Sequence, residues 1–212
     1  MKQHCYTQKA LQPNLTDIIA THFDASDALL NSFSTLVCKR LLSAGESLWR
    51  EGDKQDKLYL LNKGLLYAWF NTIEGKSFCK EVYWETDLLF CFRSLLSGEP
   101  YPFSVTALEA CELYELPRTA YLQWIETSSE NLRFHLAVVS EYYLYKEGKE
   151  EFLLLNTPEK RVAEFYQTYP DLVARLPQHI VASYLGITPI SFSRIKRRLN
   201  IEGHRGKQRS GV

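Results

Sequence analysis

The sequence of 212 residues lacks the patterns that mark metal-bound and disulfide-rich proteins. Its five cysteines include no Cys-x-x-Cys pair, which argues against both a disulfide framework and a thiolate cage. Reduced, mostly buried thiols are the simplest interpretation. The five histidines are equally dispersed, with no pair at helical spacing. We therefore expect neither a metal site nor a cofactor.

Long apolar runs are also missing. No run approaches the roughly 18 to 20 residues that a membrane span needs, and residues 1–23 contain no stretch resembling a signal peptide. The composition, 45% hydrophobic and 24% charged, is that of an ordinary globular protein, which excludes disorder. We expect a soluble, cytoplasmic protein of one or two domains, with no membrane partner.

The formal net charge of zero conceals an uneven distribution. Residues 1–156 contain 15 Lys and Arg against 21 Asp and Glu, whereas residues 157–212 contain 10 against 4. A basic C-terminal part on an acidic body indicates a nucleic-acid-binding module. A solvated basic helix would give the same charge pattern, so charge alone does not decide between them.

Residues 41–116 have the sequence pattern of a β domain. Short runs such as Leu58–Leu61 and Leu65–Phe70 are rich in aromatic and aliphatic residues, and glycine-containing turns separate them. Several short strands predict a sandwich or a roll. Before them, residues 17–37 predict one or two amphipathic helices, with Asp24 and Ser26 as possible caps.

Residues 121–155 predict one long helix, because only Gly148 interrupts a helix-forming sequence. Leu132, Leu136, Val139 and Tyr143 form a narrow apolar stripe of the coiled-coil kind, which predicts dimerisation of this helix. The alternative is that the stripe packs on the chain's own sheet. Thr157 and Pro158 then predict a new helix start, and hence a domain boundary near Asn156.

Residues 176–199 predict two helices joined by a tight turn. Val181, Ala182 and Leu185 would form an apolar face, Gly186 would relieve the turn, and Ile187 would fill the angle between the helices. Thr188 suits the cap of the second helix, and Pro189 its first position. Small Ala182 matters because closely crossing helices leave no room for a large side chain.

The second helix has the division of faces expected of a DNA recognition helix. Phe192, Ile195 and Leu199 would face inward. Ser191 and Arg194 would then approach base edges in the major groove, and Lys196, Arg197 or Arg198 would reach phosphates. Arg205, Lys207 and Arg209 add further positive charge near the C-terminus. The alternative is an ordinary helical hairpin with a basic outer face.

Taken with the β region, this motif resembles the CRP/FNR family of bacterial transcription regulators. Residues of the β region that match are Gly45-Glu46, Arg50-Glu51-Gly52-Asp53, Leu58-Tyr59, Lys63-Gly64 and Asp87, and the run Ala182–Pro189 is similar to the helix-turn-helix of the family's Bacteroidetes-type members. The resemblance implies an α+β fold. It comprises a β-roll (double-stranded jelly roll) sensor domain with N-terminal helices over residues 1–120, a long dimerisation helix over 121–156 and a helix-turn-helix domain over 157–212.

Members of this family that bind cyclic nucleotides have a phosphate cassette, with a Gly-Glu pair for the sugar and an Arg-Ser pair for the phosphate. Here the corresponding positions are Phe90-Cys91 and Tyr101-Pro102. A buried phosphate without a paired cation is strongly disfavoured, and Arg93 would substitute only if it turned inward. We therefore expect no binding of cyclic AMP or cyclic GMP. The degenerate pocket is assigned to Leu89, Phe90, Cys91, Arg93, Tyr101, Pro102 and Phe103, which would fill it or accept an apolar ligand.

The recognition helix departs from the family as well. Arg194 matches the family's base-contacting arginine, whereas Pro189 and Ile190 replace charged base-reading residues, so the sequence that is read must differ. Ile190 would contact a thymine methyl group or serve as a packing residue. The predicted DNA-contacting set is Thr188, Pro189, Ile190, Ser191, Arg194, Lys196, Arg197 and Arg198. The thirteen residues after Leu199 are too few for the family's two-stranded wing, and Cys5 alone does not fit its iron-sulfur pattern.

The leading hypothesis is a homodimeric transcription regulator that binds a near-palindromic site in double-stranded DNA without responding to cyclic nucleotides. RNA polymerase is a further candidate partner that the resemblance implies. One alternative is a ligand-gated regulator whose roll binds an unidentified apolar or acidic metabolite, or a cyclic nucleotide in an atypical way. Another is a cupin-like metalloenzyme, which the lack of histidine in residues 41–116 disfavours. We expect the protein not to be an enzyme.

Overall fold

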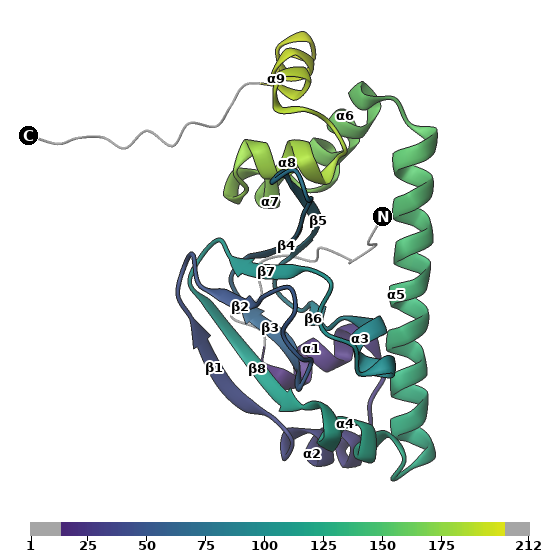
Figure 1. Cartoon of the computed structure of the whole chain (residues 1–212). Coiled ribbons are helices and arrows are strands. Elements are labelled where there is room, and N and C mark those ends of the chain that lie inside the picture. The colour runs from purple at the N-terminus through teal and green to yellow at the C-terminus, as the bar shows by residue number, and fades with distance from the viewer. Residues whose placement is uncertain (1–13, 202–212) are drawn as a thin grey trace, which may run out of the picture. The chain divides into compact units, whose positions relative to one another are not determined.

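The computed structural model describes residues 14–201, which fall into two compact units divided between Gly148 and Lys149. The first unit holds two four-stranded antiparallel sheets in the orders β1-β8-β3-β6 and β2-β7-β4-β5 (Figure 1). The strands are β1 (Cys38–Leu42), β2 (Ser47–Trp49), β3 (Lys57–Lys63), β4 (Leu66–Asn71), β5 (Ser77–Tyr83), β6 (Leu88–Leu89), β7 (Ser104–Ala107) and β8 (Cys111–Pro117). This is the β-roll that the short apolar runs predict.

The roll closes around a core to which both sheets contribute. Leu61, Leu66, Leu89 and Val105 are fully buried there, among aromatic side chains from several strands. Tight turns require glycine at the sheet ends. Gly64, between β3 and β4, has φ +112°, and a Cβ atom there would lie 2.6 Å from Cys111 Sγ and 2.8 Å from the Ala110 carbonyl oxygen.

Two short helices precede the sheets, as the sequence predicts. Helix α1 (Leu15–His22) is capped by Asn14, and α2 (Asp27–Ser34) is capped by Ser26, whose hydroxyl accepts from the Leu29 amide. Asp24 caps neither helix. The buried faces of these helices pack with residues of β3, β8 and the later helices in a second core cluster.

The long helix is shorter than predicted, because the segment from Tyr121 is not continuous. Helix α4 (Arg118–Ile125) ends before Thr127, and α5 (Ser129–Leu155) begins after a break of three residues. Ser128 accepts from the Asn131 amide, and the buried Asn131 side chain donates to the Trp124 carbonyl and to Thr127. Local capping therefore outcompetes helix propensity there. At 27 residues, α5 is about 40 Å long.

The last turns of α5 group with the second unit, which contains only helices among the described residues. These are α6 (Pro158–Thr168), α7 (Pro170–Arg175), α8 (Gln178–Tyr184) and α9 (Pro189–Arg198). Thr157 caps α6 and Pro158 takes its first position, as predicted. The division into 1–120, 121–156 and 157–212 stays a prediction. Within residues 14–201, no helix is long and apolar enough to span a membrane.

Candidate nucleic-acid interface and sensor pocket

Helices α8 and α9 form the predicted helix-turn-helix. Gly186 adopts φ +66° in the turn, and the next amide, of Ile187, donates to the Ala182 carbonyl at 2.9 Å. Ala182 is completely buried and Ile187 nearly so, which permits the close approach of the two helices. Thr188 caps α9 by accepting from the Ser191 amide at 3.2 Å. The turn and its cap are thus held by local interactions.

A contact from α6 fixes the same turn from outside the motif. The guanidinium of Arg161 donates to the carbonyl of Leu185, the residue just before Gly186. Phe165 of α6 also packs against the ring of Tyr184 in α8, with ring centroids 5.6 Å apart. The second unit therefore holds α8 and α9 in one arrangement instead of leaving them as an isolated hairpin.

The two faces of α9 differ as a recognition helix requires. Phe192 and Ile195 are buried. The predicted DNA-contacting residues that lie exposed are Thr188, Pro189, Ile190, Ser191, Arg194, Arg197 and Arg198. Ile190 is 68% exposed, which disfavours its alternative role as a packing residue. Arg198 also pairs with Glu159 of α6.

Lys196 of α9 and Leu199, which directly follows this helix, differ from the expected division of faces. Lys196 is only 8% exposed, and its ammonium lies over the rings of Tyr166 and Phe192, at 5.6 and 5.8 Å from their centroids. Burial lowers the pKa of Lys196. Its expected outward direction is therefore wrong. Leu199, expected to face inward, caps the C-terminal end of α9 and is 36% exposed.

The apolar stripe of α5 points into solvent within the first unit. Leu132, Leu136 and Tyr143 are 55%, 62% and 60% exposed, and Val139 is half-buried. The unit's own core takes a different side of the helix, where Phe134 and Val138 are buried. This arrangement disfavours the alternative in which the stripe packs on the chain's own sheet.

The positions predicted to form a degenerate cassette include aromatic side chains that pack inside the roll. Tyr101, which stands at an Arg position of the family cassette, is 3% exposed and stacks on Trp49 with ring centroids 4.4 Å apart and an interplanar angle of 11°. Phe103 also packs against Trp49, with ring centroids 5.9 Å apart and an interplanar angle of 57°. Burial raises the pKa of Tyr101 far above its usual value. Leu89 and Phe90 are buried and Pro102 half-buried.

Two further contacts reduce the capacity of this region to hold a phosphate. The Cys91 amide, at the N-cap of α3 (Phe92–Ser97), donates to the buried Gln55 side chain at 3.0 Å. Arg93 is exposed and pairs with Glu99. The guanidinium that would have to turn inward therefore points outward. Neither the Cys91 amide nor the Arg93 guanidinium is therefore available to bind a phosphate in this region.

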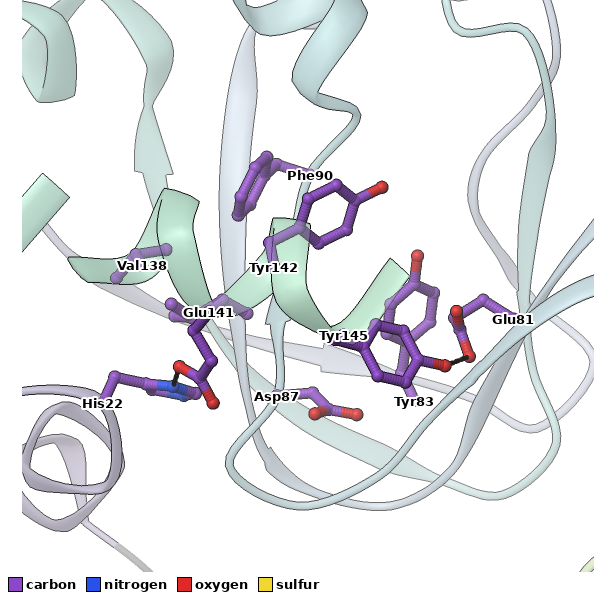
Figure 2. A pocket seen from close by; sticks show the side chains of 10 residues that line it. His22, Glu81, Tyr83, Asp87, Phe90, Val138, Glu141, Tyr142 and Tyr145 are labelled. Atoms are coloured by element: carbon purple, nitrogen blue, oxygen red, sulfur yellow. Dashed lines mark hydrogen bonds and ion pairs between the residues drawn. The ribbon is translucent and has the colours of Figure 1, made fainter. Parts of the chain in front are cut away.

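A separate cavity of about 60 Å³ lies in the first unit between α5, the end of β5 and α1 (Figure 2). Its lining comprises His22, Glu81, Tyr83, Asp87, Leu88, Phe90, Val138, Glu141, Tyr142 and Tyr145. Phe90 is the only residue of the predicted pocket in this described lining. No three His, Cys, Asp or Glu side chains within residues 14–201 are arranged as metal ligands.

Three elements meet at His22 on one side of this cavity. Its Nδ1 lies 2.6 Å from a carboxylate oxygen of Glu141, and its Nε2 lies 2.9 Å from the Thr86 carbonyl oxygen. Burial alone would lower the pKa of His22, but Glu141, the Thr86 carbonyl and the charge of Asp87 together raise it above 6.5. Because both nitrogens face acceptors, both donate when the ring is protonated. Thr86 holds its carbonyl there at φ +76°, which is unusual for a β-branched residue.

Glu81 is a buried carboxylate, 2% exposed, on the opposite side. It accepts from the Tyr145 hydroxyl at 2.6 Å and pairs with the Lys146 ammonium at 3.1 Å, both from α5. Burial and the negative charge of Glu81 raise the pKa of Tyr142 to about 12, and the same two causes raise the pKa of Tyr83 well above its usual value. Burial and the charge of Glu81 therefore both disfavour an added negative charge in the cavity.

Sequence reasoning missed this cavity because its residues are far apart in the chain. His22 and Glu141 are separated by 119 positions, and no spacing pattern links them. One signal was present: Glu81 stands beside the apolar run that ends β5, where a charged residue needs a buried partner.

Comparisons with known proteins show which domain family and which solved structures the chain is similar to. Residues 39–128 match the cyclic nucleotide-binding domain family. Curated proteins give no match. Among solved structures, FixK2 from Bradyrhizobium japonicum is similar at a TM-score of 0.67 with 16% identity, covering 79% of this chain and 86% of that one.

Two other solved structures show the same similarity of fold. The c-di-GMP-responsive global regulator CLP from Xanthomonas campestris has a TM-score of 0.65 and 15% identity, covering 84% of this chain and 93% of its own. A protein from Eubacterium rectale, described as of the CRP/FNR family, has a TM-score of 0.67 and 16% identity over 85% of this chain and 86% of its own. At such identities the likeness concerns the fold, and the Bacteroidetes type stays a prediction. Residues 39–128 are thus similar to the cyclic nucleotide-binding domain family, and the described chain has the same fold as these CRP/FNR-type structures.

Proposed function

We propose that the chain is a homodimeric transcription regulator that binds double-stranded DNA and does not need a cyclic nucleotide to do so. The observation that carries the proposal is the exposed face of α9, where Ser191 and Arg194 project from a capped and buttressed helix. Ser191 and Arg194 read base edges, and Arg197 and Arg198 contact phosphates. Lys196 has no part in this surface because it is buried.

Dimerisation uses the exposed stripe of α5. A solvent-exposed row of apolar side chains on one helix is stabilised by pairing with its twin across a two-fold axis. Such a dimer presents two recognition helices about 34 Å apart and binds a near-palindromic site. The protein then acts in the cytoplasm as a regulator, not an enzyme, with RNA polymerase as a further candidate partner.

Independence from cyclic nucleotides follows from the occupied cassette. A cyclic phosphate would have to displace Tyr101 from its stack on Trp49 and would find no arginine directed inward. The desolvation of an unpaired anion costs several kcal/mol. The stack of Tyr101 on Trp49 thus takes the place of the phosphate-binding arginine of the family.

Fluorescence anisotropy on the full-length chain tests the DNA-binding proposal. With about eight phosphate contacts per dimer, the logarithm of the binding constant falls against the logarithm of salt concentration with a slope near −7. Arg194→Ala relaxes discrimination between bases, whereas the matched control Lys160→Ala, an exposed charge on α6, leaves discrimination unchanged. Binding that is insensitive to salt, or an Arg194→Ala variant that discriminates normally, overturns the proposal.

The second candidate function is a regulator gated by a small ligand in the first unit. The cavity between α5, β5 and α1 favours it. Inside the roll, the buried Gln55 Nε2 has no hydrogen-bond partner among the described residues, and an acceptor on a ligand would satisfy it. A ligand that changes the affinity for operator DNA supports gating, and operator binding that no bound ligand alters argues against it.

A further inference from the structure

The cavity of about 60 Å³ in the first unit is separate from the surface assigned to DNA, and its lining has a distinct chemistry. Four of the ten lining residues are aromatic: Tyr83, Phe90, Tyr142 and Tyr145. Figure 2 shows Phe90 and Tyr142 side by side, and their ring centroids are 5.8 Å apart. Aromatic faces carry negative electrostatic potential and attract cations.

The charged groups of the lining are predominantly acidic. Glu81, Asp87 and Glu141 contribute carboxylates, whereas His22 contributes the one basic side chain of the ten. Glu81 and Asp87 are 2% and 4% exposed, so water screens their charge only weakly. In Figure 2 Asp87 lies between His22 and Glu81, so that Glu141, Asp87 and Glu81 form a row, with Phe90 and Tyr142 above it in this view.

The chain's own Lys146 shows that these aromatic rings and Glu81 can bind an ammonium group. The Lys146 ammonium lies 5.4 Å from the ring centroids of both Tyr142 and Tyr145 while it pairs with Glu81. The same rings and the same carboxylate therefore hold an alkylammonium group from one side. A second ammonium in the cavity would meet the same two kinds of partner.

The size of the cavity limits the ligand. A water-sized group needs roughly 10 to 15 Å³ of such space, so the cavity holds about four to six non-hydrogen atoms. Lys146 pairs with Glu81 and His22 lies 2.6 Å from Glu141, so the three carboxylates keep a net negative charge even when both partners are protonated. That charge disfavours an acidic metabolite and gains nothing from a neutral apolar one. A compact, positively charged group with an apolar body therefore fits the charge and the aromatic surface of this lining best.

We infer that this cavity is a binding site for a small organic cation, an alkylammonium whose charge faces Glu81, Asp87 and Glu141 and whose alkyl part packs on Phe90, Val138 and Tyr142. This inference goes beyond the proposed function and does not rest on it, because binding to the cavity is measured without DNA.

The test compares three probes with the same tert-butyl body but different charge: tert-butylammonium, tert-butanol and pivalate. Each is titrated into the full-length protein at constant ionic strength and followed by calorimetry and thermal denaturation. We expect tert-butylammonium to bind at least about tenfold more tightly than tert-butanol, which is about 1.4 kcal/mol. Pivalate should give no saturable binding.

Two isosteric variants separate a charge effect from loss of folding. Glu81→Gln and Glu141→Gln each remove one carboxylate, and each should weaken tert-butylammonium about tenfold while leaving tert-butanol unchanged. Glu141 is 42% exposed, so its variant tests the inference even if Glu81→Gln disturbs the contact with Lys146. The matched control is Glu147→Gln, an exposed glutamate of α5 outside the lining.

Three results would overturn the inference. Equal binding of tert-butanol and tert-butylammonium would leave an apolar cavity with no preference for charge. Tighter binding of pivalate, or no saturable binding of the ammonium, would remove the cation site. Equal weakening by Glu147→Gln would reduce the effect to the net charge of the protein. None of these results bears on DNA binding, so the inference and the proposed function fail independently.

Discussion

Substituting Leu136 by glutamate tests the proposed dimer at its most exposed aliphatic position on the α5 stripe. The side chain is 62% exposed in the single chain, and fully burying a leucine stabilises by about 1.5 to 3 kcal/mol. Burying that exposed fraction therefore contributes about 1 to 2 kcal/mol. A two-fold dimer contains the residue twice, which makes the loss about 2 to 4 kcal/mol before any repulsion between the new carboxylates.

At about 1.4 kcal/mol for each factor of ten, the dimer dissociation constant should rise roughly 30-fold to 1,000-fold. Sedimentation equilibrium measures this constant directly, and circular dichroism checks that the monomer remains folded. Leu144→Glu is the matched control. Leu144 is 66% exposed on the same helix, but it lies about 100° around the helix axis from the stripe. If Leu136→Glu leaves the dimer constant unchanged, or both variants weaken it equally, the stripe is not the dimer contact.

The remaining predictions concern the turn, the roll and the buried histidine. Gly186→Ala should destabilise the protein by about 1 to 2 kcal/mol in urea denaturation, because a Cβ atom disfavours the left-handed conformation; an unchanged midpoint contradicts this. Cyclic AMP and cyclic GMP should not shift the thermal midpoint at concentrations where a ligand at 100 times its Kd would add about 2.7 kcal/mol. A clear shift with either would refute the account of the cassette. The pKa of His22 is raised, so its stabilising contribution is complete below pH 6.5 and is lost as the pH rises through the folded-state value. Wild type should therefore lose its stability advantage over His22→Gln on going from about pH 6 to about pH 8.5, as urea midpoints report, and a constant difference would contradict it.

Local patterns predicted much of the fold. The caps at Ser26, Thr157 and Thr188 are short-range features, since each hydroxyl accepts from an amide three residues later. The turn at Gly186 is equally local. Such features depend on a few neighbouring residues and on backbone geometry, and the sequence displays both.

Features that depend on distant contacts were not predictable. Lys196 has the spacing of an exposed residue, yet its ammonium lies over Tyr166 of another helix. The cavity likewise joins His22, Glu81 and Glu141 from three separate segments. The break before Ser129 is an intermediate case. Ser128 caps locally, but the buried side chain of Asn131 holds the preceding helix end, and only the folded unit shows that burial.

Selection of binding sites from a pool of random DNA duplexes tests the central claim most directly. The full-length protein is used without added nucleotide, and the selected duplexes are sequenced. The account predicts enrichment of a near-palindromic site whose half-sites lie about 10 base pairs apart, centre to centre. Adding cyclic AMP should not change the enrichment. Recovery of no site, or of a site only when cyclic AMP is present, would contradict the account.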